Sequence, residues 1–313
     1  MPSGWQKQNA GAVRSRFYNG GMRLLAYIWL VSAACAQTMP QFLARISEEA
    51  EVFRHVAPQV LSEETLSQRA PAARRFHPRL GTAATKPIAP RIETREIISE
   101  YSFGTLKDAP GSLHEFREVI SVDGRRVSSA ESARQSLALG LTSSDDKAKK
   151  RMLETYQHFG LDNAAVDFGP LLLLFTKRNI GNYHFTLGGP DRIGADPVRA
   201  ISYRQTSGGE HMLVVAGHKA MRLPLEGRIY VRVPDGLPLR ITMDASRKDG
   251  KHEFRDEATV DYTQSAQGFL APVSVTHESY ENGRLVSQEN FRYAPFRRFG
   301  ADAAIRFSGE PVK

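Results

Sequence analysis

The chain has 313 residues, of which 41% are hydrophobic and 24% are charged, a composition typical of a globular protein with one large domain or two small ones. The formal net charge of +8 falls to +4 without residues 1–36, which hold Lys7, Arg14, Arg16 and Arg23 and no acid. Because the remaining surplus is spread over a whole domain and not clustered, we exclude nucleic acid as a partner.

The segment from Met22 to Ala36 predicts a signal peptide. Arg23 supplies the positive n-region, residues 24–31 form the apolar h-region, and the small residues at 34–36 form a cleavage site. The apolar run is shorter than the about 20 residues that a membrane-spanning helix needs, and no later run reaches that length. We therefore predict no transmembrane span, cleavage after Ala36, and a periplasmic or secreted protein.

Two features of this segment leave alternatives open. Residues 1–21 are polar and rich in glycine, unlike the start of a signal peptide, which indicates that Met22 and not Met1 is the true initiator. Cleavage after residue 36 would discard Cys35 and leave a mature protein that cannot form disulfides. The alternative is a lipoprotein anchored at Cys35, although Ser32 stands where a lipobox normally has a large aliphatic residue.

After the cleavage site, residues 37–69 are expected to form an N-terminal helix and a first strand. Pro40 fits the first turn of a helix over 41–61. The apolar residues of this helix recur at steps of three or four and share one face: Phe42, Ile46, Ala50, Phe53, Ala57 and Val60. The Pro- and Arg-rich residues 70–91 predict an exposed loop.

From residue 92 the hydrophobic period changes to two. The alternation over 97–103 and 116–122 predicts two antiparallel strands, and the second ends at the turn pair Asp123-Gly124. A helical insertion is expected over 129–180. It contains helices at 129–140 and 144–159, the second with Ala148, Met152, Tyr156 and Phe159 on one face, and a fully apolar run at 171–175 that should be buried.

The remainder of the chain predicts a succession of hairpins, because turn pairs rich in glycine separate short alternating segments. The expected strands are 183–188, 198–205, 211–216, 226–233, 238–246, 253–264, 269–281, 284–294 and 301–308. We therefore predict an α+β fold over residues 92–308, with one large, curved antiparallel sheet as a half-barrel and helices covering its concave face.

This layout resembles the LolA/LolB lipoprotein-carrier superfamily, including its LppX-like relatives. The resemblance covers about residues 40–308 and rests on the N-terminal helix, the mid-chain helical block and the later hairpins. Its short phrases are residues 225–231, 234–240, 290–293 and 296–299. The resemblance implies a half-barrel of antiparallel strands whose helices enclose an apolar cavity for acyl chains, and no functional residue is carried over from it.

A cavity of this kind would be lined by alternate strand residues and by the buried part of the helical block. The side chains expected to line it are Phe103, Phe116, Ile120, Phe168, Leu172, Phe175, Ile229, Val231, Ile241 and Met243. The same alternation is also the signal of an ordinary filled core, so both interpretations stay open.

The sequence carries no motif of an enzyme or of a metal site. The nine histidines do not fall at zinc-site spacings, no G-x-S-x-G elbow or P-loop is present, and the acid pairs at 63–64 and 145–146 fit solvated faces and helix starts. We expect no catalysis, no metal and no cofactor. The function predicted is binding of a lipid or acyl-chain ligand, as a carrier; the alternative is an envelope interaction module with a filled core and a protein partner.

Overall fold

The computed structural model describes residues 38–71, 91–143, 145–161, 167–208, 212–216 and 219–299, with the backbone alone at 109–110, 212–216 and 219–222. All of them belong to the unit Gln37–Lys313. The signal peptide predicted at 1–36, residues 72–90 of the predicted loop and the strand predicted at 301–308 lie outside the described residues.

Helix α1 (Met39–Val56) is the amphipathic helix that the sequence predicts. It begins after Thr38, whose backbone N–H donates to the Gln41 side chain at 2.8 Å, and Pro40 lies in its first turn. The apolar stripe of the helix is buried, as expected: Phe42, Ile46, Ala50 and Phe53. This stripe anchors α1 on the sheet.

The prediction that this helix continues to residue 61 is wrong. Pro58 has no N–H to donate and its ring collides with the carbonyl one turn earlier, so α1 ends at Val56 and a 3-10 turn, η1 (Ala57–Gln59), follows. Val60 is buried as expected, but it begins strand β1 (Val60–Pro71) instead of lying on the helix.

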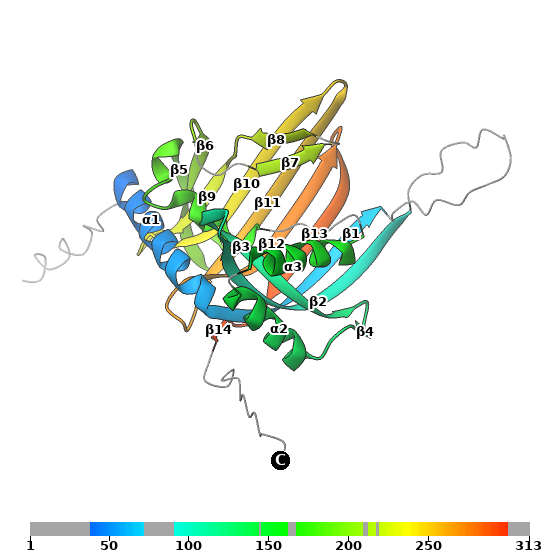
Figure 1. Cartoon of the computed structure of the whole chain (residues 1–313). Helices are drawn as coiled ribbons and strands as arrows, with labels where there is room; N and C mark the ends of the chain where they lie inside the picture. Colours follow the sequence, from blue (N-terminus) through cyan, green and yellow to red (C-terminus); the bar gives the residue numbers. More distant parts are fainter. Residues whose placement is uncertain are drawn as a thin grey trace, which may run out of the picture. The chain divides into compact units, whose positions relative to one another are not determined.

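One antiparallel sheet of twelve strands dominates the fold (Figure 1). Its strands after β1 are β2 (Ile92–Leu106), β3 (Ala109–Val122), β4 (Arg125–Arg126), β5 (Tyr183–Ile193), β6 (Asp196–Gln205), β9 (Glu226–Arg232), β10 (Pro238–Asp249), β11 (His252–Gln264), β12 (Leu270–Glu281), β13 (Arg284–Tyr293) and β14 (Arg297–Arg298). The order is β4-β3-β2-β1-β13-β12-β11-β10-β9-β6-β5, and β14 pairs with β1. Because β4 and β5 do not pair, the sheet stays open, as a half-barrel does.

The predicted fold class is therefore confirmed, with three additions. Strands β4, β14 and β8 (Lys219–Leu223) were not predicted; β8 forms a separate two-stranded sheet with β7 (Met212–Ala216). The predicted hairpin turns at Asp123-Gly124 and Asn282-Gly283 both have positive φ at each residue, the conformation that a two-residue hairpin turn requires.

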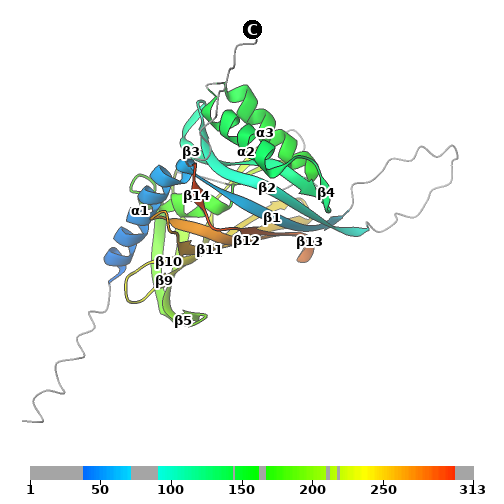
Figure 2. The same ribbon diagram turned by 90° about the horizontal axis from the view of Figure 1, so that it is seen from below.

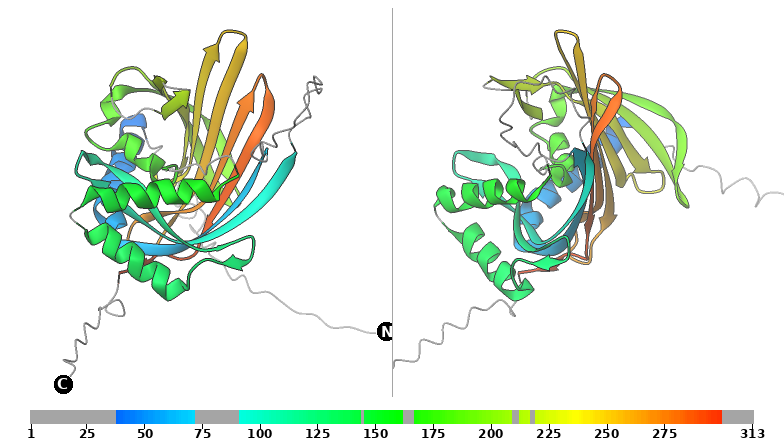
Figure 3. Two further views of the ribbon diagram at one scale, coloured as in Figure 1. Left: turned by 45° about the vertical axis from the view of Figure 1, so that its right-hand side comes forward. Right: turned by 90° about the vertical axis from the view of Figure 1, so that its right-hand side faces the viewer.

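The face that carries Leu66, Tyr101 and Ile241 is called the concave face here, because α1 and the segment 169–182 lie on it and the sheet bends around them (Figure 3). That segment contains two 3-10 helices, η2 (Gly169–Phe175) and η3 (Ile180–Asn182). The predicted apolar run at 171–175 is thus the body of η2, and it is buried except for the half-buried Leu173.

Helices α2 (Ala130–Thr142) and α3 (Asp146–Phe159) lie beside β2 and β3 at one end of the sheet (Figure 2). Leu137 of α2 packs with Phe116 of β3 on the outer face, opposite Tyr101. Helix α3 contributes to both faces, because its Met152 joins this outer cluster whereas its Tyr156 joins the main core. Helix α2 therefore covers the outer face and not the concave one.

Gly227 lies on β9, which is paired between β6 and β10, at a position that has no room for a side chain. Tyr203 is its cross-strand partner on β6, and the Tyr203 hydroxyl donates to the Thr242 carbonyl of β10 at 2.8 Å. A Cβ on residue 227 would collide with this carbonyl and come within 3.0 Å of the Tyr203 hydroxyl. The missing side chain thus lets the aromatic ring span three strands.

We therefore expect Gly227→Ala to lower the free energy of unfolding by about 1–3 kcal/mol, the usual cost of overpacking. Gly189→Ala is the control, because a Cβ there meets nothing within 4 Å. Urea unfolding followed by circular dichroism measures both. Equal stability of the two variants would contradict the steric requirement for glycine at position 227.

Candidate functional site

Most of the side chains predicted to line a cavity lie together on the concave side of the sheet. Eight of the ten belong to the main core cluster: Phe103, Phe168, Leu172, Phe175, Ile229, Val231, Ile241 and Met243. They come from β2, η2 and its preceding residue, β9 and β10, so segments far apart in the sequence meet here. The concave interior is therefore the first candidate for a functional site.

The other two predicted lining residues do not join this cluster. Phe116 lies opposite Ser102 in the β2–β3 register, whereas Phe103 lies opposite Glu115, so Phe103 and Phe116 are on opposite faces. Phe116 packs under α2 with Leu137. Ile120 is half-buried at the bulge where the β2–β3 register shifts.

The concave interior is filled in this structure. Leu172 and Phe175 of η2 are both 0% exposed, and the Phe175 ring lies 4.9 Å from the Tyr203 ring in an edge-to-face arrangement. On the other side of the interior, Phe53 of α1 lies 5.2 Å from Phe103. Segment 167–175 thus acts as a roof that places its own apolar side chains on the sheet.

Two buried side chains hold the backbone of this roof. The Glu115 carboxylate accepts from the backbone N–H of Asp167 at 2.7 Å and of Gly169 at 2.9 Å. The Tyr262 hydroxyl donates to the Gly169 carbonyl at 2.9 Å and accepts from the Leu172 N–H at 3.1 Å. The Asp167 carboxylate adds two contacts with β3, because it accepts from the backbone N–H of Glu115 at 2.7 Å and lies 3.0 Å from Nδ1 of His114.

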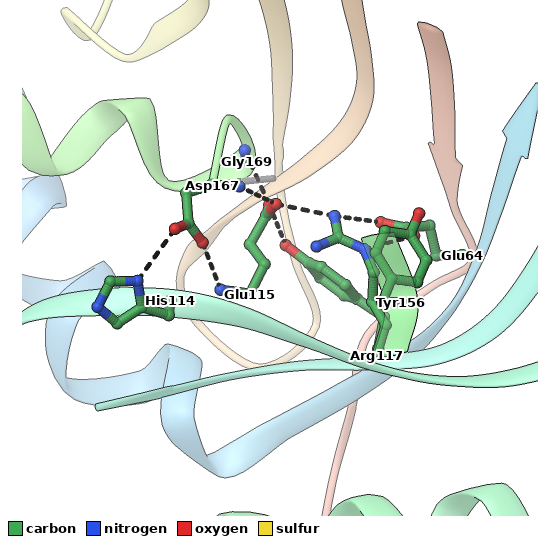
Figure 4. Close-up of polar contacts among 8 residues, drawn as sticks. Glu64, His114, Glu115, Arg117, Tyr156, Asp167 and Gly169 are labelled. Carbon is green, nitrogen blue, oxygen red and sulfur yellow. Dashed lines mark hydrogen bonds and ion pairs between the residues drawn. The ribbon is translucent and has the colours of Figure 1, made fainter. Parts of the chain in front are cut away.

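Glu115 also belongs to a buried charge cluster on the concave face (Figure 4). Arg117 of β3 donates through Nε and Nη2 to Glu64 of β1 at 2.7 and 2.8 Å, and through Nη2 to Glu115 at 2.8 Å. All three side chains are 1% exposed. The Tyr101 hydroxyl donates to Glu115 at 2.6 Å, and the Tyr156 ring lies 4.7 Å from the guanidinium.

Opposing effects set the charges in this cluster. Burial lowers the pKa of Arg117, but attraction to Glu64 and Glu115 outweighs it and holds that pKa well above its ordinary value. Burial raises the pKa of Glu64, and it outweighs the opposite effect of the Arg117 guanidinium. Burial by itself would therefore favour the neutral acid. The bidentate geometry decides between the two, because Nε and Nη2 of Arg117 donate to both oxygens of Glu64, the arrangement that a carboxylate forms; we take the pair as ionised.

A second polar group continues across the concave face. Gln68 of β1 donates to Glu289 of β13 at 2.8 Å, and Glu289 lies 3.0 Å from Nδ1 of His277 on β12. The imidazole stacks on Phe168 of the roof with centroids 4.4 Å apart. Its Nε2 lies 3.3 Å from Asp256, within ion-pair range but outside hydrogen-bond geometry.

These carboxylates surround His277 strongly enough to keep it charged. Burial lowers the pKa of His277, but the neighbouring carboxylates of Asp256 and Glu289 outweigh burial and raise the pKa to about 9. The imidazolium therefore contributes to the link between roof and sheet at neutral pH.

Sequence analysis missed these polar groups. The pair at 63–64 was expected on a solvated face, yet Glu64 is 1% exposed. Its only signal is the parity of β1, where Glu64 shares a face with Leu66 and Gln68. Among the described residues no group of side chains could hold a metal ion.

A hollow with a mainly apolar lining lies elsewhere, between α2, α3 and β3, and is called the α2–α3 cleft here. Its volume is about 530 Å³. Helix α3 contributes the face predicted from the sequence: Ala148, Met152, Tyr156 and Phe159. A larger polar trough of about 770 Å³ lies over β5, β6, β9, β10 and β11 and is lined by charged pairs such as Arg204–Glu226.

Within the described part of the chain, no helix is long and apolar enough to cross a membrane.

Comparisons with known proteins give likenesses of fold. No protein-family model and no curated protein matches this sequence. Among solved structures, an outer membrane lipoprotein-sorting protein domain from Vibrio parahaemolyticus matches at 10% identity and TM-score 0.33, covering 83% of this chain and 94% of that one. A LolA superfamily protein from Nitrosomonas europaea matches at 10% identity and TM-score 0.29, covering 82% and 93%.

A DUF1329 family protein from Desulfovibrio piger matches at 12% identity and TM-score 0.32, covering 83% of this chain and 98% of that one. One of these structures carries the name of the superfamily that the layout of this sequence resembles.

We expect Arg117→Met to lower the free energy of unfolding by about 3–5 kcal/mol, because two carboxylates stay buried without their cation. Adding Glu64→Gln to this variant should recover part of the loss. Arg204→Met, which breaks an exposed pair, is the control and should cost about 1 kcal/mol or less. Urea unfolding measures all three; no recovery in the double variant would contradict the ionised cluster.

His277 should make stability depend on pH. Its folded pKa of about 9 lies above the ordinary 6.5, so its contribution is complete below about pH 6.5 and is lost as pH rises through about 9. Between pH 7 and pH 10 the wild type should lose about 2–3 kcal/mol more of its free energy of unfolding than His277→Gln. His252→Gln, at an exposed pair, is the control. Parallel pH profiles of wild type and His277→Gln would refute this assignment.

Proposed function

We propose that this protein is an exported, non-enzymatic binding protein of the periplasm or the secreted fraction, and that it holds a lipid or other apolar ligand on the concave face of the half-barrel. A carrier role is the specific form of this proposal. The observation that carries it is the roof, since Leu172 and Phe175 occupy an apolar surface that is continuous with Ile229, Val231 and Ile241.

A ligand that replaces the roof on the sheet would bury a similar amount of apolar surface. Apolar surface in contact with the sheet stabilises by about 25 cal/mol per Å², whether a leucine or an acyl chain supplies it. A ligand tail that replaces the roof side chains therefore recovers the burial that their departure loses. What must be broken in addition is the set of four hydrogen bonds to Glu115 and Tyr262, the two contacts of the Asp167 carboxylate with β3, and the stacking of Phe168 on His277.

The filled interior supports a second candidate. If segment 167–175 never leaves the sheet, the fold is an envelope interaction module with a solid core, which binds a partner protein through its surface. The eight clustered lining residues are at most 8% exposed, as such a core requires.

We expect protein purified from the envelope fraction of cells that express the full chain to carry a stoichiometric lipid, seen by native mass spectrometry and lipid extraction. Leu172→Gln should lose this lipid, because a polar side chain then lies in the binding surface. Leu137→Gln is the matched control: it is equally buried at 0% exposure but belongs to the outer cluster, so it should keep the lipid.

Circular dichroism would verify that both variants fold. A clean protein mass, together with no uptake of a fluorescent fatty acid, would refute the binding proposal and favour the interaction module. Equal lipid loss in both variants would also count against the concave site, because it would follow destabilisation and not position.

A further inference from the structure

The α2–α3 cleft is formed by regular faces of its two helices. Helix α2 contributes Ser136, Leu139 and Gly140, its C-cap residue Ser143 also lines the cleft, and α3 contributes the face that contains Met152. At Gly140 the helices come so close that a Cβ would collide with the Met152 sulfur. The helices are thus fixed to each other at this point and leave the hollow beside the edge of β3.

The cleft exposes apolar side chains to solvent. Leu139 is 56% exposed and Val127 is 52% exposed, whereas the other exposed large hydrophobic residues of the described chain reach at most 40%. Both line the cleft, together with the buried Val119 and Tyr156. Exposed apolar side chains that gather at one hollow are typical of a binding site, unlike single ones scattered over a surface.

The rim of the cleft is positive. Arg151 lines the cleft, is exposed, and forms no ion pair with any described residue. Arg126, next to Val127 in the chain, is likewise exposed and unpaired within the described part. By contrast, the neighbouring Lys150 pairs with Asp108 and Arg134 pairs with Glu100. Arg151 therefore remains available at the rim of the cleft, and Arg126 lies one residue from the lining residue Val127.

The interior end of the cleft offers no such attraction to an anion. Arg117 lines this end, but its guanidinium is already held between Glu64 and Glu115. Glu118, which follows Arg117 on β3, is the acidic residue among those that line the cleft. A negative head group would therefore stay at the rim near Arg151, while an apolar chain would point inward toward Met152 and Tyr156.

The size of the hollow selects among apolar occupants. Its volume of about 530 Å³ lies within the roughly 300–1,000 Å³ of small-molecule sites. A single flexible apolar chain fits within this space.

We infer that the α2–α3 cleft is a binding site for a single-chain anionic amphiphile, with its chain against Val127, Leu139 and Met152 and its head group at Arg151. This site is separate from the concave face, and it requires no movement of the roof. It would let the protein hold one such molecule even in the closed form of the half-barrel.

The test is calorimetric titration of the purified protein with dodecanoate below its micelle-forming concentration. Dodecyltrimethylammonium, with the same chain length and the opposite charge, is the matched probe. The wild type should bind dodecanoate at one site and at least fivefold more tightly than the cationic probe. Arg151→Glu should weaken dodecanoate about fivefold, since an attraction at a partly exposed site becomes a repulsion. Arg284→Glu, at an exposed arginine of the β12–β13 hairpin, is the charge control and should leave binding unchanged.

Leu139→Asp should weaken binding of both probes about tenfold, and because Leu139 is 56% exposed the variant should still fold. Val273→Asp, at an exposed apolar residue outside the cleft, is the matched control and should bind dodecanoate as the wild type does. Loss of binding in Leu172→Gln but not in Leu139→Asp would overturn this inference while supporting a ligand on the concave face. Sensitivity to Leu139→Asp alone would support the cleft even if the concave face binds nothing. Equal affinity for the two probes would overturn the anionic selectivity.

Discussion

Burial of one guanidinium between two carboxylates is the constraint on which the rest of the structure depends. Arg117 reaches past β2 to Glu64 of β1, so strands that are not neighbours are linked across the sheet. Glu115 extends the link to the roof, and Tyr156 extends it to α3. A buried charge that loses its ion-pair partner strongly destabilises the folded state. A slip of β1 or β3 by one residue would point these side chains out of the core, so the cluster also fixes the register.

Strand β3 and helix α3 separate the concave interior from the α2–α3 cleft. Helix α3 lies along the free edge of β3, where it covers unpaired backbone that would otherwise invite another strand. One face of this helix serves both compartments, because Tyr156 packs in the main core and also lines the cleft. A change in one compartment can therefore reach the other through a single side chain, without passage through the sheet.

Local patterns in the sequence were sufficient to predict helices and turns, but not to predict which residues pair across strands. The stripe from Phe42 to Phe53 and the turn at Asn282-Gly283 are signals within a few residues, and both elements form where expected. The end of α1 could have been placed from Pro58 alone. The faces of Phe103 and Phe116 could not, because their parity depends on the register between two strands.

The polar groups of the interior were beyond such patterns for a different reason. Gln68 and Glu289 are 221 residues apart in the chain, and each alone has the composition of a solvent-facing strand position. Only the pairing of β1 with β13 makes them partners. Hydrophobic periodicity reports which residues avoid water, and it cannot report charges that enter the core in pairs.

The pairing of the first long strand with the last has a consequence for how the chain acquires its structure. Strand β1 sits in the middle of the sheet order, between β2 and β13, although it comes first in the sequence. A chain that emerges N-terminus first, from a ribosome or from a translocation channel, cannot complete this sheet until Tyr293 has appeared. Contacts of such high sequence separation make folding slow. The topology thus delays completion of the central sheet until nearly the whole chain has emerged.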